Sequence, residues 1–308
     1  MKKLLIIDDL EESFQIEAEK LGFAVDYLPN ITKAEALAVL HEYDGVAVRS
    51  KFNFDKEVID KGPKLKFIAR AGAGMDNIDE AYAAEKNIAL INAPEGNRDA
   101  VAEHAMGMLL SLMNNLRQAD MQVRDKLWDR EGNRGYELMG KTVAIIGYGN
   151  NGGALARRLK GFGVKVLAYD KYKTGFSDEY VQEASMEEVV KHADVLSLHI
   201  PLTRETRQLV NDEYLRHFKK PIFFISLARG EITNTRSILK SIKTGRILGA
   251  GLDVLEVEKF PRLAEQDWYN DLINEPKVLL SPHVGGWTFD SYRKISEVLA
   301  TKLKNLDL

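Results

Sequence analysis

The chain has 308 residues, of which 45% are hydrophobic and 29% charged, as expected for an ordinary globular protein of about two domains. Its net charge is −3 and it has no cysteine, so we expect no nucleic-acid partner, no disulfide framework, no thiolate metal site and no cysteine nucleophile. No apolar run reaches the ~18 residues of a membrane span, and the early run "LLII" is too short for a signal peptide. We therefore expect a cytoplasmic protein that does not bind a membrane and holds no metal.

Short apolar runs alternate with helical patterns along residues 1–97. The runs lie at 3–8, 23–28, 45–50, 66–71 and 88–93. They lack polar alternation, which is typical of strands buried on both faces of a parallel sheet. Between two of the runs, Thr32 and Glu35 have the spacing of a helix-capping box.

Residues 97–125 are predicted to form one long amphipathic helix. Their apolar side chains recur at three- and four-residue spacing, at Val101, Ala105, Leu109, Leu112 and Leu116. No proline or glycine-rich linker interrupts this stretch, so we expect a rigid connection between two lobes.

A second series of apolar runs follows, at 142–147, 165–170, 194–200, 221–226, 248–254 and 277–282. A last helix after residue 288 has no strand left to lead into, and we expect it to return to the first lobe. The fold class is therefore α/β, with two doubly wound parallel-sheet lobes. We place residues 1–97 plus 288–308 in one domain and 98–287 in the other.

Three glycines after the first strand of the second series have the spacing G-x-G-x-x-G. They are Gly147, Gly149 and Gly152, in "TVAIIGYGNNGGALARRL", between a strand and a helix. Glycine permits the tight turn and the close approach of a pyrophosphate to the backbone, and the helix N-terminus attracts the phosphate charge. Asp170 ends the next strand, 23 residues after Gly147, where a carboxylate binds the ribose hydroxyls.

These features predict a nicotinamide dinucleotide site. The charge of Asp170 favours NAD over NADP because it repels a 2′-phosphate, although Lys171 and Lys173 follow closely and weaken this preference. Asn151 stands where an aliphatic residue is common. It either hydrogen-bonds near the phosphates or loosens the start of the helix.

Three later strands end in residues suited to acid–base chemistry. Arg229 follows one strand, Asp253 and Glu258 follow the next, and His283 follows the last. Taken singly, each has an ordinary structural explanation: a surface ion pair, a solvated carboxylate, a packed histidine. Parallel strands deliver their carboxyl ends to one edge, where open α/β sheets bind ligands. A cation for a carboxylate and a carboxylate-supported histidine suit a 2-hydroxy or 2-oxo acid.

At this point the sequence resembles the D-isomer-specific 2-hydroxy acid dehydrogenase family. The resemblance rests on "RAGAGMDNID", "VAEHAMGMLL", "GKTVAIIGYGNNG", "DVLSLHIPLTRET", "LARGEI", "GLDVLEVE" and "SPHVGG" and covers nearly the whole chain. It implies that Arg229 binds the substrate carboxylate and carbonyl. It also implies that His283 donates the proton and that Glu258, rather than Glu256, supports it. The implied architecture is a Rossmann NAD-binding domain and a flavodoxin-like substrate domain with a cleft between them.

The resemblance also assigns further contacts. The backbone amides of Ala73 and Gly74 are expected to bind the substrate carboxylate. Cofactor contacts are expected from Asn150, Asn151, His199, Pro201, Thr206, Leu227, Ala228, Asp253, Gly285 and Gly286. Lys259, Ser226, Leu227 and Trp287 depart from the usual family residues; Lys259 replaces a proline, which puts the position of the Glu258 loop in doubt.

The substrate is less sharply defined. Arg49, Ser50 and Lys51 end a strand of the first series and, with Arg70, are placed to bind a phosphate; the alternative is a basic surface cluster. This pattern most resembles the 3-phosphoglycerate dehydrogenases, which would imply serine biosynthesis. Glyoxylate, hydroxypyruvate and D-lactate remain alternatives. The sequence stops soon after the last helix, so we expect no C-terminal regulatory domain.

Two other functions share these features. NAD(H)-sensing binding proteins of the same fold can retain the three residues without significant turnover. The absence of disordered interaction tails argues against this function, and NADH turnover with 2-oxo acids decides between the two. Formate dehydrogenases carry glutamine in place of Glu258, which argues against that function. The resemblance further implies a homodimer built on the nucleotide-binding domain, with residues 126–141 contributing. Packing within the chain would satisfy the apolar stripe of the long helix equally well.

Overall fold

The computed structural model describes residues 2–306, which form two compact units. The first unit takes in the described residues up to Arg98 and from Trp287 onward, and the second is Asp99–Gly286. The boundary between them falls inside helix α5 (Pro94–Met113).

The first unit contains a five-stranded parallel sheet in the order β2-β1-β3-β4-β5, which is the flavodoxin-like order. Its strands are β1 (Lys2–Ile6), β2 (Phe23–Tyr27), β3 (Gly45–Val48), β4 (Phe67–Arg70) and β5 (Ala89–Asn92). Its helices are α1 (Ser13–Lys20), α2 (Lys33–Val39), the 3₁₀ turn η1 (Leu40–Glu42), α3 (Lys56–Asp60), α4 (Glu80–Glu85) and α12 (Phe289–Lys304).

Strand β1 shows why the predicted runs are apolar without interruption. Leu4 and Ile6 pack into one core cluster, whereas Leu5 and Ile7 pack into another. Because successive side chains point to opposite faces of a sheet, a strand covered on both faces must be apolar at every position. The prediction of parallel strands buried on both faces is confirmed.

Helix α12 completes the first unit although it comes last in the chain. Leu299 and Leu303 are buried against α1 and the sheet, and the predicted return of this helix is confirmed. The Thr288 hydroxyl caps the helix by accepting from the N–H of Ser291 at 3.0 Å. Lys302 Nζ donates to the carbonyl of Asn92 at 2.8 Å and pairs with Glu95 at 2.9 Å.

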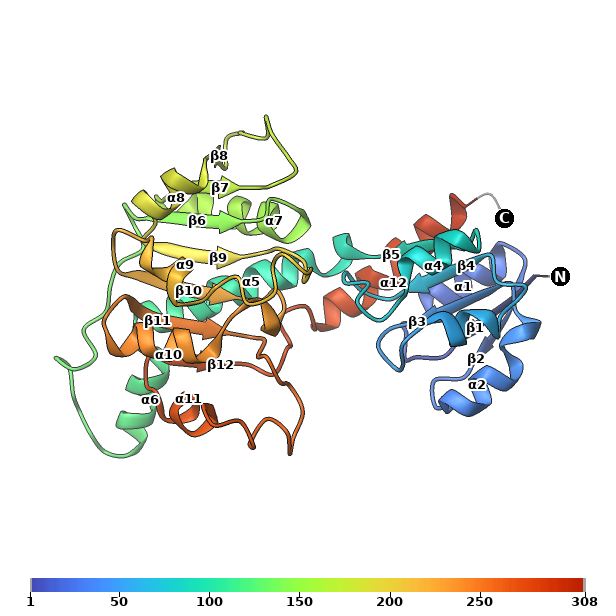
Figure 1. Cartoon of the computed structure of the whole chain (residues 1–308), viewed down its shortest axis with the longest axis horizontal. Coiled ribbons are helices and arrows are strands. Elements are labelled where there is room, and N and C mark those ends of the chain that lie inside the picture. Colours follow the sequence, from blue (N-terminus) through green and yellow to red (C-terminus); the bar gives the residue numbers. More distant parts are fainter. Residues whose placement is uncertain (1, 307–308) are drawn as a thin grey trace. The chain divides into compact units, whose positions relative to one another are not determined.

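The second unit contains a seven-stranded parallel sheet in the order β12-β11-β10-β9-β6-β7-β8. This is the Rossmann order extended by one strand, and it reverses between β6 and β9. Figure 1 shows the strands stacked in this sequence from β8 to β12. They are β6 (Thr142–Ile146), β7 (Lys165–Tyr169), β8 (Gln182–Glu183), β9 (Val195–Leu198), β10 (Ile222–Ser226), β11 (Ile247–Leu252) and β12 (Val278–Leu280).

Helices cover both faces of this larger sheet, and the apolar side chains of β6 again divide between two core clusters. The helices are α6 (Leu116–Arg124), α7 (Asn150–Leu159), the 3₁₀ turn η2 (Lys160–Phe162), α8 (Met186–His192), α9 (Asp212–Arg216), the 3₁₀ turn η3 (Gly230–Ile232), α10 (Thr235–Lys243) and α11 (Tyr269–Asn274). The two-residue strand β8 was not predicted from the sequence.

The prediction of one helix over residues 97–125 is wrong. The chain forms α5 and α6, which are separated at Asn114 and Asn115. Asn115 has a φ of 52°, a left-handed conformation that asparagine tolerates and that a continuous right-handed helix excludes. The two helices differ in burial as well, since no residue of α6 is buried.

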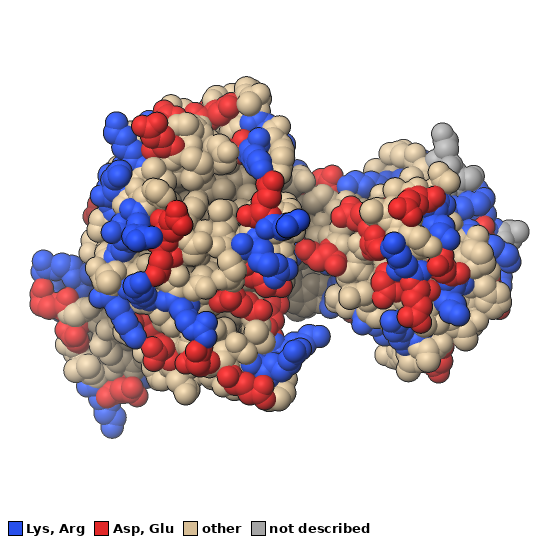
Figure 2. All heavy atoms as spheres, in the orientation of Figure 1, with Lys and Arg blue, Asp and Glu red and all other residues tan. Residues whose placement is uncertain are grey.

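Charge is distributed evenly over the visible surface. On the face drawn in Figure 2, basic and acidic side chains of the described residues alternate over the second unit. Within residues 2–306, none of the helices combines the length and hydropathy that a membrane span requires.

The packing of α12 leads to a stability prediction. Leu299 is 0% exposed, whereas Phe289 of the same helix is 100% exposed. Truncating Leu299 to alanine leaves a cavity and should lower the free energy of unfolding of the first unit by about 2–5 kcal/mol, measured by urea denaturation. The control Phe289→Ala should change it by less than about 0.5 kcal/mol. Equal effects of the two substitutions would contradict this packing.

Candidate active site

The turn between β6 and α7 requires the predicted glycines. Gly147 has a φ of 94°, and a Cβ built on it would lie 2.6 Å from the carbonyl oxygen of His199. A Cβ on Gly152 would lie 2.1 Å from the carbonyl oxygen of Gly147, so the helix approaches the turn closely. Gly149 precedes α7 as its N-cap and has open space around it. Bare backbone and a helix N-terminus thus face the carboxyl edge at the point where the strand order reverses.

The start of α7 also presents a polar group that lacks a partner. Asn150 and Asn151 are the first residues of this helix. The side-chain oxygen of Asn151 is buried and has no hydrogen bond within the part of the chain that the structure describes. A buried amide in this state fits a polar ligand beside the helix start, which is where a dinucleotide pyrophosphate would lie.

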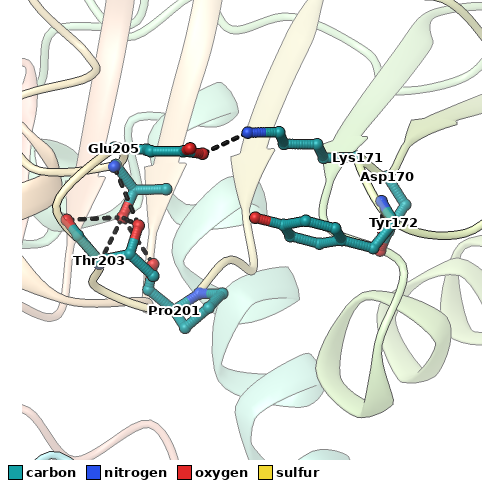
Figure 3. Close-up of polar contacts among 7 residues, drawn as sticks. Asp170, Lys171, Tyr172, Pro201, Thr203 and Glu205 are labelled. Carbon is teal, nitrogen blue, oxygen red and sulfur yellow. Dashed lines mark hydrogen bonds and ion pairs between the residues drawn. The ribbon is translucent and has the colours of Figure 1, made fainter.

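Asp170 is held rigidly after β7. Its Oδ2 accepts from the N–H of Tyr148 at 2.8 Å, and its Oδ1 accepts from the N–H groups of Tyr172 and Lys173 at 2.9 and 3.1 Å. Both neighbouring lysines have other acceptors. Figure 3 shows Lys171 reaching across to its ion-pair partner Glu205, and Lys173 Nζ donates to the Tyr148 carbonyl at 3.0 Å.

The loop after β9 carries three of the predicted cofactor contacts. The hydroxyl of Thr206 donates to the carbonyl of Pro201 at 2.7 Å and accepts from the N–H of Thr203 at 2.7 Å. His199 Nε2 lies 2.9 Å from the hydroxyl of Ser197. Burial lowers the pKa of His199 to about 4, so this ring is neutral at pH 7. A neutral ring can accept or donate a hydrogen bond without adding charge to the site.

The remaining predicted cofactor residues lie on neighbouring loops of the same sheet edge. Leu227 and Ala228 directly follow β10 and are both 7% exposed. A Cβ on Gly285 would lie 2.6 Å from Cδ2 of Leu227, so these loops pack closely. Asp253 directly follows β11, is 3% exposed, and accepts from the N–H of Gly285 at 2.9 Å. Gly286 is the last residue of the second unit.

Arg229, Glu258 and His283 lie together at this edge, as the strand-end argument predicted. They follow β10, β11 and β12, and they line one hollow of about 490 Å³. Nδ1 of His283 lies 2.9 Å from Oε2 of Glu258, with the two side chains 45% and 40% exposed. One guanidinium nitrogen of Arg229 donates to the carbonyl of Ala228 at 2.7 Å. Lys259, in the place of the usual proline, does not prevent Glu258 from reaching the histidine.

The surroundings of His283 favour its protonated form. The hydrogen bond with Glu258 raises the pKa of His283 above its ordinary value near 6.5. Burial and the positive charge of Arg229 lower the pKa in part, and the charge of Asp253 raises it. The ring therefore carries a proton further into the neutral pH range than an isolated histidine does.

Glu256, the other glutamate of "LEVE", has a structural position instead. Its carboxylate accepts from Nε2 of Gln208 and from the N–H of Thr235, both at 2.8 Å. These contacts hold Glu256 on the start of α10, so Glu258 is the carboxylate beside the histidine.

The predicted phosphate cluster of the first unit is arranged differently from our expectation. Oδ2 of Asp8 accepts from the N–H groups of Arg49, Ser50 and Lys51 at 2.7, 3.0 and 3.0 Å. Lys51 Nζ donates to the carbonyls of Ile7, at 3.1 Å, and Pro29. The backbone amides that a phosphate would use therefore already bind a carboxylate, and Lys51 is directed into its own unit.

Two other features of the first unit concern predicted substrate contacts. The guanidinium of Arg49 lies over the ring of Trp287, 4.0 Å from its centroid, so this departure from the family pattern holds an arginine in place. Ala73 and Gly74 follow β4 in a loop fixed by Asn92, whose Nδ2 donates to the carbonyl of Ala73 at 2.7 Å. Within residues 2–306, the N–H groups of Ala73 and Gly74 make no hydrogen bond.

Sequence reasoning assigned no role to two residues that the structure brings to this edge. His104 of α5 and Ser281 after β12 form a hydrogen-bonded chain with Asp253. Both lie inside motifs that carried the family resemblance, "VAEHAMGMLL" and "SPHVGG", and this was the available signal.

The chain was compared with known proteins. Residues 106–285 match the family described as "D-isomer specific 2-hydroxyacid dehydrogenase, NAD binding domain". Hydroxypyruvate reductase of Thermotoga maritima is 34% identical over 89% of this chain and 88% of the relative. Glyoxylate reductase of Pyrococcus furiosus is 33% identical over 96% and 87%. D-3-phosphoglycerate dehydrogenase of Methanocaldococcus jannaschii is 34% identical over 99% of this chain, which spans 57% of that relative.

Solved structures show the same similarity. D-2-hydroxyisocaproate dehydrogenase is 26% identical, with a TM-score of 0.86 over 99% of this chain and 96% of the other. D-lactate dehydrogenase from Aquifex aeolicus, complexed with NAD and lactic acid, is 26% identical, with a TM-score of 0.82 over 98% and 94%.

The contact between Glu258 and His283 predicts the effect of a substitution on the histidine. Glu258→Gln removes the carboxylate charge that favours the imidazolium, so the pKa of His283 should fall. The measurement is an NMR titration of the histidine ring, with the His283 signal assigned from its loss in His283→Asn. Glu256→Gln is the matched control and should leave that pKa unchanged. A His283 titration that does not respond to Glu258→Gln would contradict the assignment.

Proposed function

This chain belongs to the D-isomer specific 2-hydroxyacid dehydrogenase family, and we propose on that premise that Arg229, Glu258 and His283 carry out its reaction. Members of this family are NAD-dependent oxidoreductases that act on small D-2-hydroxy acids. The observation that carries the proposal is the 2.9 Å contact between His283 and Glu258 in the hollow that Arg229 also lines.

His283 would move the proton of the reaction. Because Nδ1 is bound to Glu258, the other ring nitrogen, Nε2, is the one that would donate to the 2-oxo oxygen of the substrate. NADH, when bound, supplies the hydride to C2. In the reverse direction the neutral ring would accept the hydroxyl proton. Reduction thus needs the protonated ring and oxidation the neutral one, and Glu258 favours reduction.

Arg229 would bind and polarise the substrate. A planar guanidinium can bind a carboxylate and an adjacent carbonyl oxygen together and stabilise the charge that develops on that oxygen. Arg229 lines the same hollow as His283, and its positive charge lowers the pKa of the histidine. The free N–H groups of Ala73 and Gly74 are proposed as further donors to the substrate carboxylate.

The cofactor would lie along the carboxyl edge of the larger sheet. Its pyrophosphate would face Gly147, Gly149 and Gly152 and the start of α7 with Asn150 and Asn151. The Asp170 carboxylate would accept the ribose hydroxyls, which favours NAD because a 2′-phosphate would meet this negative charge. The other residues proposed to contact the cofactor are His199, Pro201, Thr206, Leu227, Ala228, Asp253, Gly285 and Gly286.

For the substrate we propose a small unphosphorylated 2-oxo acid, such as glyoxylate or hydroxypyruvate, ahead of a phosphorylated one. The reason is that Asp8 already takes up the amides of residues 49–51 and Lys51 is directed inward. Arg49 and Arg70 are the remaining cations of this cluster, and they keep 3-phosphoglycerate and serine biosynthesis as the second candidate.

A substrate panel tests the proposal. Glyoxylate, hydroxypyruvate, pyruvate and 3-phosphohydroxypyruvate should be assayed with NADH and NADPH over a range of pH. We expect turnover with NADH, faster for the unphosphorylated acids, and a rate of reduction that declines as pH rises through the pKa of His283. His283→Ala should lower kcat by about 10²- to 10⁴-fold, and Arg229→Gln should lower kcat/KM by at least ~100-fold.

The controls for these variants are His41→Ala and Arg236→Gln, which change exposed side chains of the same types. NADH binding without turnover of any of the four acids would contradict the proposed reaction and support an NAD(H)-sensing protein instead.

The homodimer is proposed from an exposed apolar surface. The segment from α6 to β6 carries large apolar side chains that are 49–79% exposed, which is unusual for a surface that stays in water. These residues, here called the apolar arm, are Leu116, Met121, Val123, Leu127, Trp128, Tyr136 and Met139. Residues 126–141, which the family resemblance connects with dimerisation, contain four of them.

We predict that the protein is a dimer and that charged substitutions in the apolar arm dissociate it. Trp128 and Met139 are 79% and 74% exposed, and replacing both with glutamate would place charges in a buried interface. Light scattering after size-exclusion chromatography should give a dimer for the wild type and a monomer for Trp128→Glu/Met139→Glu. Phe289→Glu, at a fully exposed position outside the arm, should remain dimeric. A monomeric wild type would refute the proposed dimer.

A further inference from the structure

The loop that carries His283 has an unusual backbone. His283 has a φ of 55°, a left-handed conformation that residues with a side chain adopt infrequently. Such a conformation persists when surrounding contacts determine it. Most of these contacts here involve Asp253. The N–H of His283 donates to the backbone carbonyl of Asp253 at 2.8 Å and to that of Ser281 at 3.1 Å. The N–H groups of Val284 and Gly285 donate to the two carboxylate oxygens of Asp253, both at 2.9 Å.

Ser281 connects Asp253 to a residue on another element. The hydroxyl of Ser281 donates to Oδ1 of Asp253 at 2.5 Å, and Nε2 of His104 lies 2.9 Å from the same hydroxyl oxygen. A serine hydroxyl has a single hydrogen. Because the hydroxyl donates this hydrogen to Asp253, its oxygen can only accept from His104. Nε2 of His104 therefore carries a proton. Met108 Sδ lies 4.0 Å from the hydroxyl and is a weaker acceptor than a carboxylate.

The chain of contacts therefore runs from α5 to the backbone of residues 283–285. His104 is part-buried, with its side chain 29% exposed, and Nε2 is also 3.7 Å from Oδ1 of Asp253. Gly285 adds to the constraint, because a Cβ there would lie 2.9 Å from Oδ2 of Asp253 and 3.5 Å from Cδ2 of His104. Together these contacts fix the orientation of the Asp253 carboxylate.

We propose that His104 is a positioning residue for the reaction: through Ser281 it fixes Asp253, and Asp253 fixes the loop that orients His283. The proposal rests on the proposed function, in which His283 moves the proton. Without the His104 donor, the Ser281 hydroxyl can turn away from Asp253, and the left-handed conformation of His283 loses part of its support.

Two kinetic consequences distinguish positioning from a merely structural role. A less well oriented His283 slows proton transfer, so kcat falls while the KM for the 2-oxo acid, whose carboxylate Arg229 would bind, changes little. The charged groups that face His283 are Glu258, Arg229 and Asp253. Because the Asp253 charge raises the pKa of His283, a displaced Asp253 should also move the pH profile of reduction to lower pH.

The test compares His104→Leu, which cannot donate, with His104→Gln, whose side-chain amide can donate at a similar reach. We expect His104→Leu to lower kcat about 3- to 10-fold, which corresponds to the loss of one hydrogen bond, with the KM for the 2-oxo acid changed less than about twofold. His104→Gln should recover most of kcat and the wild-type pH profile. Ser281→Ala, which removes a single oxygen atom, should resemble His104→Leu.

The double variant His104→Leu/Ser281→Ala should be no slower than Ser281→Ala alone, because both substitutions break the same chain of contacts. Thermal melting checks that each variant is folded. Wild-type kcat and pH profile in both His104→Leu and Ser281→Ala would overturn the proposal. So would a His104→Gln variant as impaired as His104→Leu.

A separate measurement keeps this proposal distinct from the proposed reaction. The ring signal of His283 can be titrated by NMR in wild type, His104→Leu and His104→Gln, without any substrate. A lower His283 pKa in His104→Leu, restored in His104→Gln, supports the positioning role even if no 2-oxo acid of the panel is turned over. An identical titration in all three proteins refutes it even in an active enzyme.

Discussion

The carboxylate of Asp253 is the group on which the arrangement of the candidate active site depends. This carboxylate accepts from the hydroxyl of Ser281 and from the N–H groups of Val284 and Gly285. The backbone carbonyl of Asp253 accepts from the N–H of His283. These contacts surround His283, whose left-handed backbone conformation is otherwise sparsely populated. In this loop Nδ1 of His283 lies 2.9 Å from Glu258, and the raised pKa of the histidine follows from that contact.

The parallel sheet explains how residues far apart in sequence reach one edge. Arg229, Glu258 and His283 follow three consecutive strands that are adjacent in the sheet, so the loops that carry them are neighbours. The same edge carries the glycine turn after β6 and Asp170 after β7, on the other side of the point where the strand order reverses. One face of strand ends therefore holds both the groups suited to a dinucleotide and the groups suited to proton transfer.

The strands, and the position of Arg229, Glu258 and His283 at one sheet edge, could be predicted from the sequence because their signals are local. An apolar run identifies a strand buried on both faces, and a residue that follows such a run belongs to the carboxyl edge. The break at Asn115 escaped prediction because the apolar spacing continues across it and only a backbone torsion ends the helix. The two-residue strand β8 is too short to produce a pattern.

Contacts between distant residues were beyond the reach of sequence reasoning. His104 and Ser281 are 177 positions apart, and nothing in either segment shows that they meet. The basic cluster at residues 49–51 was interpreted from its charge, its place at a strand end and a family resemblance, whereas the structure shows that Asp8 already binds its amides. In both cases the function of a polar group depends on its hydrogen-bond partner, and the packing of the whole unit determines which partner that is.

The central claim is that His283, held by Glu258 and Asp253, delivers the proton to the substrate. The most direct measurement is a crystal structure of the protein with NADH and oxamate, an unreactive analogue of a 2-oxo acid. The account predicts Nε2 of His283 within hydrogen-bond distance of the oxygen that represents the 2-oxo group, with the guanidinium of Arg229 on the carboxylate. An analogue bound beside the nicotinamide ring but out of reach of His283 would contradict it.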